Sequence, residues 1–159
     1  MLNGTCLWYS CWYGRLPASH LIRRYIYYYM GAHFGEHITI DGYDGDPLLL
    51  NSKRVVKSCI VELCKDLNMH PLARIKIVSA PDNHIKDPGG WSAFMVIAES
   101  HIAVHTFPRR HFLSADVYTC QNGVDVDFVV DFFKKKFHLQ DVEMHFIKRG
   151  TKYPEHNRF

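Results

Sequence analysis

Apolar residues alternate with polar or small ones along several segments of the chain, at the two-residue period of a β-strand. In the clearest segment His101 and His105 share one face, while the aliphatic Ile102 and Val104 share the other. The same alternation, bounded by turn residues, predicts strands over residues 37–43, 74–79, 92–98, 101–107, 113–119 and 141–148.

Two helices are predicted from apolar residues spaced three and four positions apart. The first has its N-cap at Asn51 or Ser52 and ends at residues 70–71, and the second has its N-cap at Asp125. Their apolar stripes are Val56, Cys59 or Ile60, Leu63 and Leu67 in the first, and Val126, Val129, Val130, Phe133 and Phe137 in the second.

The expected order of elements is β-α-β-β-β-α-β, with a turn at residues 44–47 and a loop rich in Pro, Asp and Gly at residues 81–90. Both helices need an apolar surface to pack on. We therefore expect an α+β fold, a two-layer sandwich in which an antiparallel-rich sheet carries two helices on one face. The open face of this sheet then presents His101 and His105.

Composition and charge narrow the classes of function. The 159 residues fit one domain with a buried core, and contents of 47% hydrophobic and 22% charged residues are typical of globular proteins. The net charge of +3 comes mainly from scattered Lys and Arg, which predicts no nucleic-acid partner. Five cysteines without a CxxC pair do not make a disulfide framework, and they favour a reducing, cytoplasmic setting.

Residues 1–29 differ from the rest of the chain. They are rich in Trp and Tyr, without a clear period. They contain neither the roughly 20-residue apolar stretch of a membrane span nor the basic and apolar regions of a secretory signal. We interpret them as an atypical N-terminal extension, from an upstream start codon or an added segment, and expect no membrane partner. Residues 30–159 form the expected domain.

The region from Ser92 to Cys120 contains a specific constellation of residues. Glu99, Ser100 and His101 open the string ESHIAVHTFP, the string ADVYTC ends at Cys120, and Ser92 lies eight residues before Ser100. This constellation resembles the signature of the bacterial and archaeal S-adenosylmethionine decarboxylase proenzymes, which reads ESH-[IL]-[ST]-IHTWPE and then a strand ending D-[VIL]-[FY]-[TS]-C. The run HITIDGY also resembles the first strand of one branch of this family.

The resemblance implies a proenzyme that makes its own cofactor by cleavage between Glu99 and Ser100. The Ser hydroxyl attacks the preceding carbonyl to give an ester, and elimination followed by hydrolysis leaves a pyruvoyl group derived from Ser100. Ser92 and His105 correspond to the family residues that stabilise the tetrahedral intermediate and remove the Ser Cα proton. The pyruvoyl ketone forms a Schiff base with a substrate amine, and Cys120 corresponds to the donor of a proton after decarboxylation.

Three departures from the family pattern matter. Ala103 replaces Ser or Thr, Phe107 replaces Trp, and Arg109 replaces a Glu that binds the ribose hydroxyls of the substrate in the family. An Arg side chain donates hydrogen bonds but cannot accept them. The resemblance still makes S-adenosylmethionine the first choice of substrate, and the departure at Arg109 leaves arginine or ornithine, which relatives on this fold decarboxylate, as the second. We name His101, Phe107, Arg109 and Trp91 as candidate substrate-binding residues.

Two other classes of function are alternatives. His101, His105, His111 and Cys120 are zinc-ligand types, but no HxxxH helix, CxxC pair or carboxylate set accompanies them, and we expect no metal. The other alternative is a homologue that never cleaves itself and acts as a binding or regulatory partner. Our main expectation is a pyruvoyl-dependent decarboxylase of spermidine synthesis that works as a homodimer of processed chains.

Overall fold

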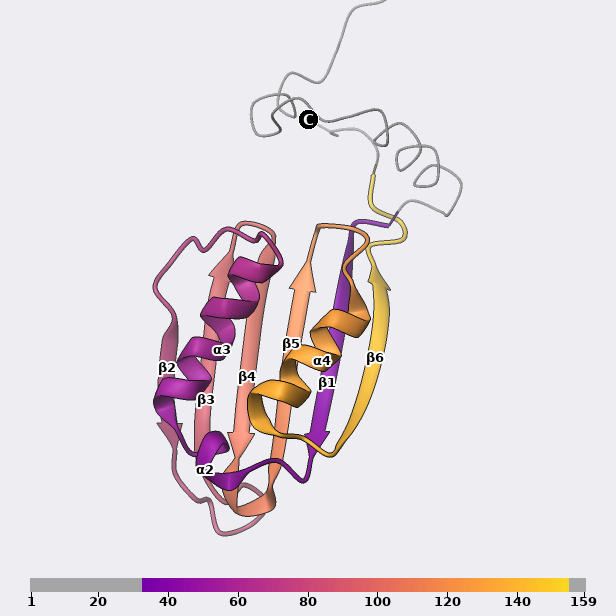
Figure 1. The fold of residues 1–159 in the computed structure, drawn as a ribbon. Coiled ribbons are helices and arrows are strands. Elements are labelled where there is room, and N and C mark those ends of the chain that lie inside the picture. Colours follow the sequence, from indigo (N-terminus) through magenta and orange to yellow (C-terminus); the bar gives the residue numbers. More distant parts are fainter. Residues whose placement is uncertain (1–32, 155–159) are drawn as a thin grey trace, which may run out of the picture. The chain divides into compact units, whose positions relative to one another are not determined.

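The computed structural model describes residues 33–154, so the interpretation of residues 1–29 lies outside the described residues. Its strands are β1 (Gly35–Tyr43), β2 (Lys76–Ala80), β3 (Gly90–Ile97), β4 (Ser100–Phe107), β5 (Phe112–Thr119) and β6 (Asp141–Arg149) (Figure 1). Its helices are α2 (Pro47–Leu50), α3 (Lys53–Asp66) and α4 (Val126–Phe137), and the 3₁₀ turn η1 (Pro108–Arg110) joins β4 to β5. Within residues 33–154, no helix has the length and apolar character needed to span a membrane.

The six strands form one antiparallel sheet in the order β2-β3-β4-β5-β1-β6. Helices α3 and α4 both lie over one face of it, which confirms the predicted two-layer α+β sandwich (Figure 1). All six predicted strand ranges correspond to strands, but the expected order β-α-β-β-β-α-β leaves one of them out: four strands, β2 to β5, lie between α3 and α4. Antiparallel neighbours joined by short turns account for this arrangement of β3, β4 and β5.

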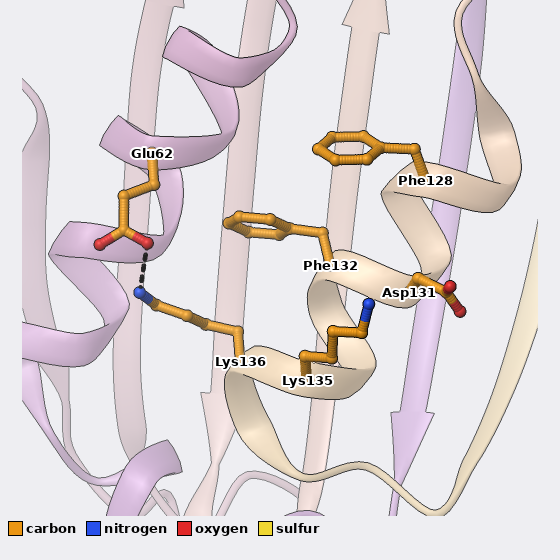
Figure 2. A pocket seen from close by; sticks show the side chains of 6 residues that line it. All are labelled: Glu62, Phe128, Asp131, Phe132, Lys135 and Lys136. Atoms are coloured by element: carbon orange, nitrogen blue, oxygen red, sulfur yellow. Dashed lines mark hydrogen bonds and ion pairs between the residues drawn. The ribbon is translucent and has the colours of Figure 1, made fainter.

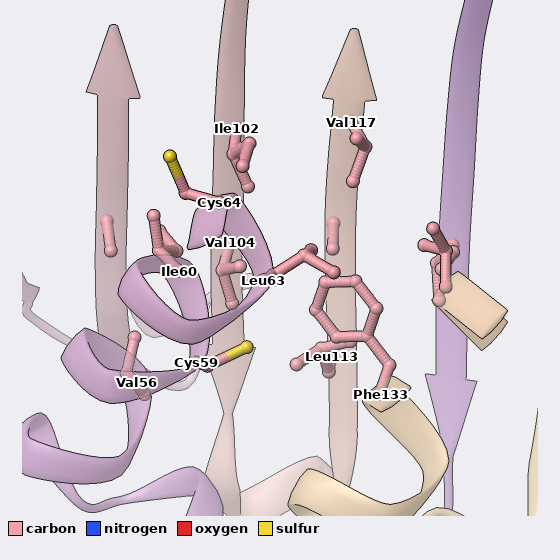
Figure 3. Packing of buried hydrophobic residues seen from close by; sticks show 14 of the residues in the cluster. Val56, Cys59, Ile60, Leu63, Cys64, Ile102, Val104, Leu113, Val117 and Phe133 are labelled. Atoms are coloured by element: carbon pink, nitrogen blue, oxygen red, sulfur yellow. The ribbon is translucent and has the colours of Figure 1, made fainter. Parts of the chain in front are cut away.

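The core lies between the helices and the sheet. Ile60 and Leu63 of α3, Phe133 of α4 and the sheet residues Val104 and Leu113 belong to one cluster, and all five are completely buried (Figure 3). Burying a side chain of this size stabilises the fold by roughly 1.5–3 kcal/mol. The predicted helical stripes therefore form the contact between the two layers.

The opposite face of the sheet presents the histidines of β4. His105 is exposed and His101 is half-buried, as the alternation along this strand predicted. On the neighbouring strand β3, the side chains of Phe94 and Val96 share this face and stay 42% and 41% exposed. The open face therefore combines reactive side chains with exposed apolar ones.

Two short elements escaped the sequence pattern. Residues 47–50 form α2, and Asp46 is its N-cap. The Oδ1 of Asp46 accepts a hydrogen bond of 2.8 Å from the backbone N–H of Leu48. The sequence predicted only a turn there, and it did not predict η1. One helical turn is too short to show a 3.6-residue period, so a periodicity argument cannot detect it.

Candidate active site

The turn between β3 and β4 places Ser100 in an unusual backbone conformation. Ile97 pairs with Ser100 across the two strands, so Ala98 and Glu99 form a two-residue connection. The φ angle of Ser100 is 148°, a region that side-chain-bearing residues seldom occupy. Such backbone strain gathers at functional sites, where the surrounding structure holds it in place. The backbone at the junction between Glu99 and Ser100 is therefore strained.

The carbonyl group of Glu99 is held by the residue that follows β5. The backbone N–H of Cys120 donates a hydrogen bond of 2.8 Å to the carbonyl oxygen of Glu99. This oxygen belongs to the peptide bond between Glu99 and Ser100. A backbone N–H aimed at it polarises the carbonyl and can hold the negative charge that develops when a nucleophile attacks.

The thiol of Cys120 lies beside this junction and is held in its protonated form. Burial of the group raises its pKa above the usual value, and the nearby negative charge of Glu99 acts in the same direction. The residue as a whole remains exposed, so a substrate can reach it. A protonated, accessible thiol is suited to giving a proton to a carbanion.

The carboxylate of Glu99 points toward the segment between α3 and β2. It accepts hydrogen bonds from the backbone N–H of His70 (3.1 Å), from Nδ1 of the same residue (2.8 Å) and from Nε2 of Gln121 (3.4 Å). Partial burial opposes its charge, but the bonds from His70 outweigh burial and hold the pKa of Glu99 below its usual value. Glu99 is thus a charged anchor of the turn.

His101 contacts the hydroxyl of Ser100 directly. Its Nδ1 lies 3.2 Å from Ser100 Oγ, its ring stacks on Phe94 with centroids 5.2 Å apart, and the Tyr118 ring meets it edge-on at 5.7 Å. Burial lowers the pKa of His101, and the charge of Arg149 and any charge on His37 lower it further. Its ring is therefore neutral at neutral pH.

Ser92 and His105 pair with each other at a different place on the sheet. They lie opposite one another on β3 and β4, and His105 Nδ1 is 3.0 Å from Ser92 Oγ. His105 lies five residue steps from Ser100 along the extended strand β4, which corresponds to roughly 17 Å. Within one chain, the structure therefore brings Glu99, Ser100 and Cys120 together and keeps the Ser92–His105 pair apart from them.

Comparison with known proteins identifies the family. The family model described as S-adenosylmethionine decarboxylase matches residues 36–150. The chain belongs to the S-adenosylmethionine decarboxylase family. The matched range holds every residue of the candidate site, and the family's enzymes are carboxy-lyases.

Relatives of the same family come from archaea and bacteria. The S-adenosylmethionine decarboxylase proenzymes of Pyrococcus horikoshii and Pyrobaculum islandicum are 31% and 32% identical to this chain over 116 residues, which is 73% of it and 78% and 88% of theirs. The Acetivibrio thermocellus proenzyme is 28% identical over 74% of this chain and 89% of its own. A crystal structure of the Aquifex aeolicus adenosylmethionine decarboxylase has the same fold, with a TM-score of 0.65 at 21% identity, over 79% of this chain and 98% of that one.

The three remaining candidate substrate-binding residues of this decarboxylase-family chain lie away from Ser100. Trp91 sits on the helix side of the sheet, where Nε1 donates to the Asn51 carbonyl over 2.8 Å, so it does not share the open face with His101. Phe107 packs against Phe112 with centroids 5.5 Å apart. Arg109 is exposed, and its Nη1 lies 3.0 Å from a carboxylate oxygen of Asp82.

Four residues around His101 escaped the sequence analysis as site residues. His37 Nε2 is 3.0 Å from Asp116 Oδ1, Arg149 Nη1 donates to His37 Nδ1 over 3.1 Å, and the Arg149 guanidinium lies 4.9 Å from the centre of the Tyr118 ring. Alternation places each of them on the same face of its own strand. The pairing of β1 with β5 and β6, which brings them together, could not be read from the local pattern.

The pocket drawn in Figure 2 lies between α3 and α4 and contains none of the candidate site residues. Its lining residues are Glu62, Phe128, Asp131, Phe132, Lys135 and Lys136. Lys136 Nζ lies 2.6 Å from Glu62 Oε2 across it. Among residues 33–154, no three His, Cys, Asp or Glu side chains gather as a metal site would require.

Proposed function

We propose that the protein cleaves itself between Glu99 and Ser100 and then decarboxylates S-adenosylmethionine to S-adenosylmethioninamine and CO2, a step of spermidine synthesis. The observation that carries the proposal is the 2.8 Å hydrogen bond from Cys120 N–H to the carbonyl oxygen of Glu99, next to a Ser100 with a φ angle of 148°. Family membership and the names of the relatives support the substrate.

The residues around position 100 fit a pyruvoyl group made from Ser100. A hydroxyl, a strained peptide bond and a carbonyl held by a backbone N–H are the requirements for a shift of the acyl group from nitrogen to oxygen. A pyruvoyl group supplies a ketone that condenses with a substrate amine and withdraws electrons from the breaking bond. The protonated Cys120 thiol is the proposed donor of a proton to the carbon that loses CO2.

The distance between Ser100 and His105 favours a homodimer. A base acts within hydrogen-bond reach of its proton, and roughly 17 Å of strand separates these two residues in one chain. If Ser92 and His105 serve cleavage, they serve the junction of a second copy packed on the open face. The exposed Phe94 and Val96 supply apolar surface for that contact.

The cytoplasm is the proposed compartment. Among the described residues Cys59, Cys64 and Cys120 are all free thiols, as in a reducing environment. The proposed proton donation during decarboxylation needs the Cys120 thiol in this reduced form. The proposal includes no nucleic acid or membrane partner.

Arginine or ornithine remains the second substrate because Arg109 stands where the resemblance requires an acceptor of ribose hydroxyl protons. The Arg109–Asp82 ion pair occupies the guanidinium, and it places a carboxylate beside position 109. A comparison of CO2 release from S-adenosylmethionine, arginine and ornithine decides between the substrates. Release from S-adenosylmethionine far above the other two supports the proposal, and the reverse order replaces it.

Intact mass measurement tests the cleavage itself. We expect the purified protein to show two fragments that separate between Glu99 and Ser100, the second lighter by one ammonia than a fragment with N-terminal Ser. The control variant Ser100→Ala has no hydroxyl and should remain one chain. A wild-type chain that stays as uncut as this control contradicts the proposed function and leaves a non-processing homologue.

A further inference from the structure

We propose that His101 is the catalytic base that activates the Ser100 hydroxyl in the first step of self-cleavage. This inference rests on the proposed function, because it assigns a residue to a step of the proposed cleavage. The sequence analysis placed His101 only among candidate substrate-binding residues.

The contact with the nucleophile is direct. His101 Nδ1 lies 3.2 Å from Ser100 Oγ, at the outer limit of the reach that a general base requires. His105 lies roughly 17 Å along the same strand, too far to accept this proton within one chain. His37 is engaged on both ring nitrogens, by Asp116 and by Arg149. Since Arg149 only donates, it occupies the lone pair of His37 Nδ1.

The neighbours of His101 hold its ring in one orientation and keep it unprotonated. Phe94 stacks on one side with an interplanar angle of 27°, and Tyr118 meets the ring at 70°. The charge of Arg149 and any charge on His37 disfavour a proton on His101, while Asp116 favours it. A fixed, neutral imidazole with Nδ1 facing a hydroxyl has the lone pair that a base needs.

Formation of the ester needs no reactant other than these residues. The Ser100 hydroxyl proton moves to His101 Nδ1 as Oγ forms a bond to the carbonyl carbon of Glu99. The carbonyl oxygen becomes negative and keeps its hydrogen bond from Cys120 N–H. The bond from carbon to the Ser100 nitrogen then breaks, and His101 returns the proton to that nitrogen. The products are an ester and a free amine, and His101 is regenerated.

This assignment divides the cleavage between two histidines. His101 serves the formation of the ester, and the proposed task of His105, removal of the Ser100 Cα proton, begins only after the ester exists. The two variants should therefore stop at different chemical species. Hydroxylamine near neutral pH distinguishes these species because it cleaves an ester readily, and fragment masses separate a cut at Ser100 from slow attack on the Asn–Gly bonds at residues 3–4 and 122–123.

The experiment uses freshly translated full-length chains of the wild type, His101→Asn, His105→Ala and His145→Asn. Asn keeps an acceptor near the position of Nδ1 without its basicity, and His145 is a control because it is an exposed histidine of β6. We expect wild type and His145→Asn to cleave unaided. His105→Ala should cleave only with hydroxylamine, leaving N-terminal Ser100. His101→Asn should form ester at least tenfold more slowly and remain uncut with hydroxylamine over the same period.

Each other outcome has a defined meaning. A His101→Asn chain that cleaves at the wild-type rate, or that accumulates hydroxylamine-sensitive ester as fast as His105→Ala does, overturns this inference alone. A wild-type chain that never cleaves overturns the proposed function as well. Circular dichroism establishes which variants fold, and His101→Gln replaces His101→Asn if the latter does not.

The pH dependence of ester formation provides a second test, measured in the His105→Ala background so that elimination does not contribute. The rate should rise with pH as His101 loses its proton, and this rise should disappear in the His101→Asn, His105→Ala double variant. The charged or titratable groups that face His101 are His37, Asp116, Tyr118 and Arg149, while β3 contributes the uncharged Phe94. A rise that survives in the double variant belongs to one of these groups and overturns the inference.

Discussion

Glu99 and His70 hold each other through two hydrogen bonds, and a third joins His70 to Ala98. The backbone N–H and ring Nδ1 of His70 donate to the Glu99 carboxylate over 3.1 and 2.8 Å, and the carbonyl of His70 accepts from the N–H of Ala98 over 2.8 Å. The segment between α3 and β2 thereby fixes both residues of the turn that precedes Ser100. The strained φ angle of Ser100 is held by this clamp on one side and by the bond from Cys120 on the other.

Replacing His70 should slow self-cleavage. His70→Ala removes the ring contact with Glu99 but keeps the backbone contact, so the turn loosens without being lost. Because the His70 side chain is 65% exposed, we expect a loss of stability of only about 1 kcal/mol, together with a severalfold slower appearance of fragments on a denaturing gel. His84→Ala is the matched control, since His84 is an exposed histidine of the loop at residues 81–90. If His70→Ala and His84→Ala cleave at equal rates, the contact between His70 and Glu99 does not contribute to cleavage.

Acidification should weaken the same clamp. The folded pKa of Glu99 is lowered, so its charge stabilises the folded state above the ordinary pKa, about 4.3, and this contribution is lost as pH falls through the lower folded value. We expect the free energy of unfolding of Ser100→Ala to exceed that of Glu99→Gln, Ser100→Ala at neutral pH. The difference should shrink as the pH falls below about 4.3. A difference that is constant with pH would show that the charge of Glu99 is not what stabilises the turn.

Mixing two inactive variants should restore cleavage. A Ser100→Ala chain keeps His105, and a His105→Ala chain keeps Ser100. If each junction uses the His105 of a second copy, a mixed dimer contains one complete site, and the His105→Ala chain should then be cut. Mass spectrometry of tagged chains, co-translated and separately translated, measures this. Fragments from neither chain in the co-translated sample would contradict the composite site, provided that tag capture shows mixed dimers.

Replacing Cys120 with Ala should impair decarboxylation but leave self-cleavage intact. In Cys120→Ala the backbone N–H that contacts the Glu99 carbonyl remains, so fragments should still form. The proton-donating thiol is gone, and loss of a positioned proton donor typically costs about 10²–10⁴ in rate. We therefore expect CO2 release per processed chain to fall by at least about a hundredfold, with Cys64→Ala as the control for loss of a thiol elsewhere. Full turnover by the processed Cys120→Ala protein would exclude the thiol as the donor.

The sequence predicted the two layers and the strands on either side of Ser100, but it did not predict the distances across the site. The structure confirms the face of β4 on which the alternation placed His101 and His105, and the helices lie where the apolar spacing and the cap residues predicted them. Ser100 and Cys120 meet because β4 and β5 are paired antiparallel neighbours, an arrangement that adjacent strands in sequence usually adopt. Local pattern was sufficient for these features because each depends on one element or on two consecutive ones.

The positions of His37 and His105 show where sequence reasoning ends. His37 reaches the site because β1 pairs with β5, a contact between elements far apart in the chain. His105 was expected at the cleavage junction from resemblance, although a strand over residues 101–107 already implies that it lies far from Ser100. A resemblance assigns tasks to residues but does not say which copy of the chain performs them.

The order of strands has a consequence for the protein after the proposed cleavage. The first fragment would carry β1, β2 and β3 and the second β4, β5 and β6, yet the sheet runs β2-β3-β4-β5-β1-β6 (Figure 1). Three of its five ladders, β3 with β4, β5 with β1 and β1 with β6, would then join one fragment to the other. Because β1 of the first fragment lies between β5 and β6 of the second, the two fragments would be interleaved within one sheet. The two fragments would separate only if the whole domain unfolded. The cleaved protein would therefore keep its fold although the bond between residues 99 and 100 is broken.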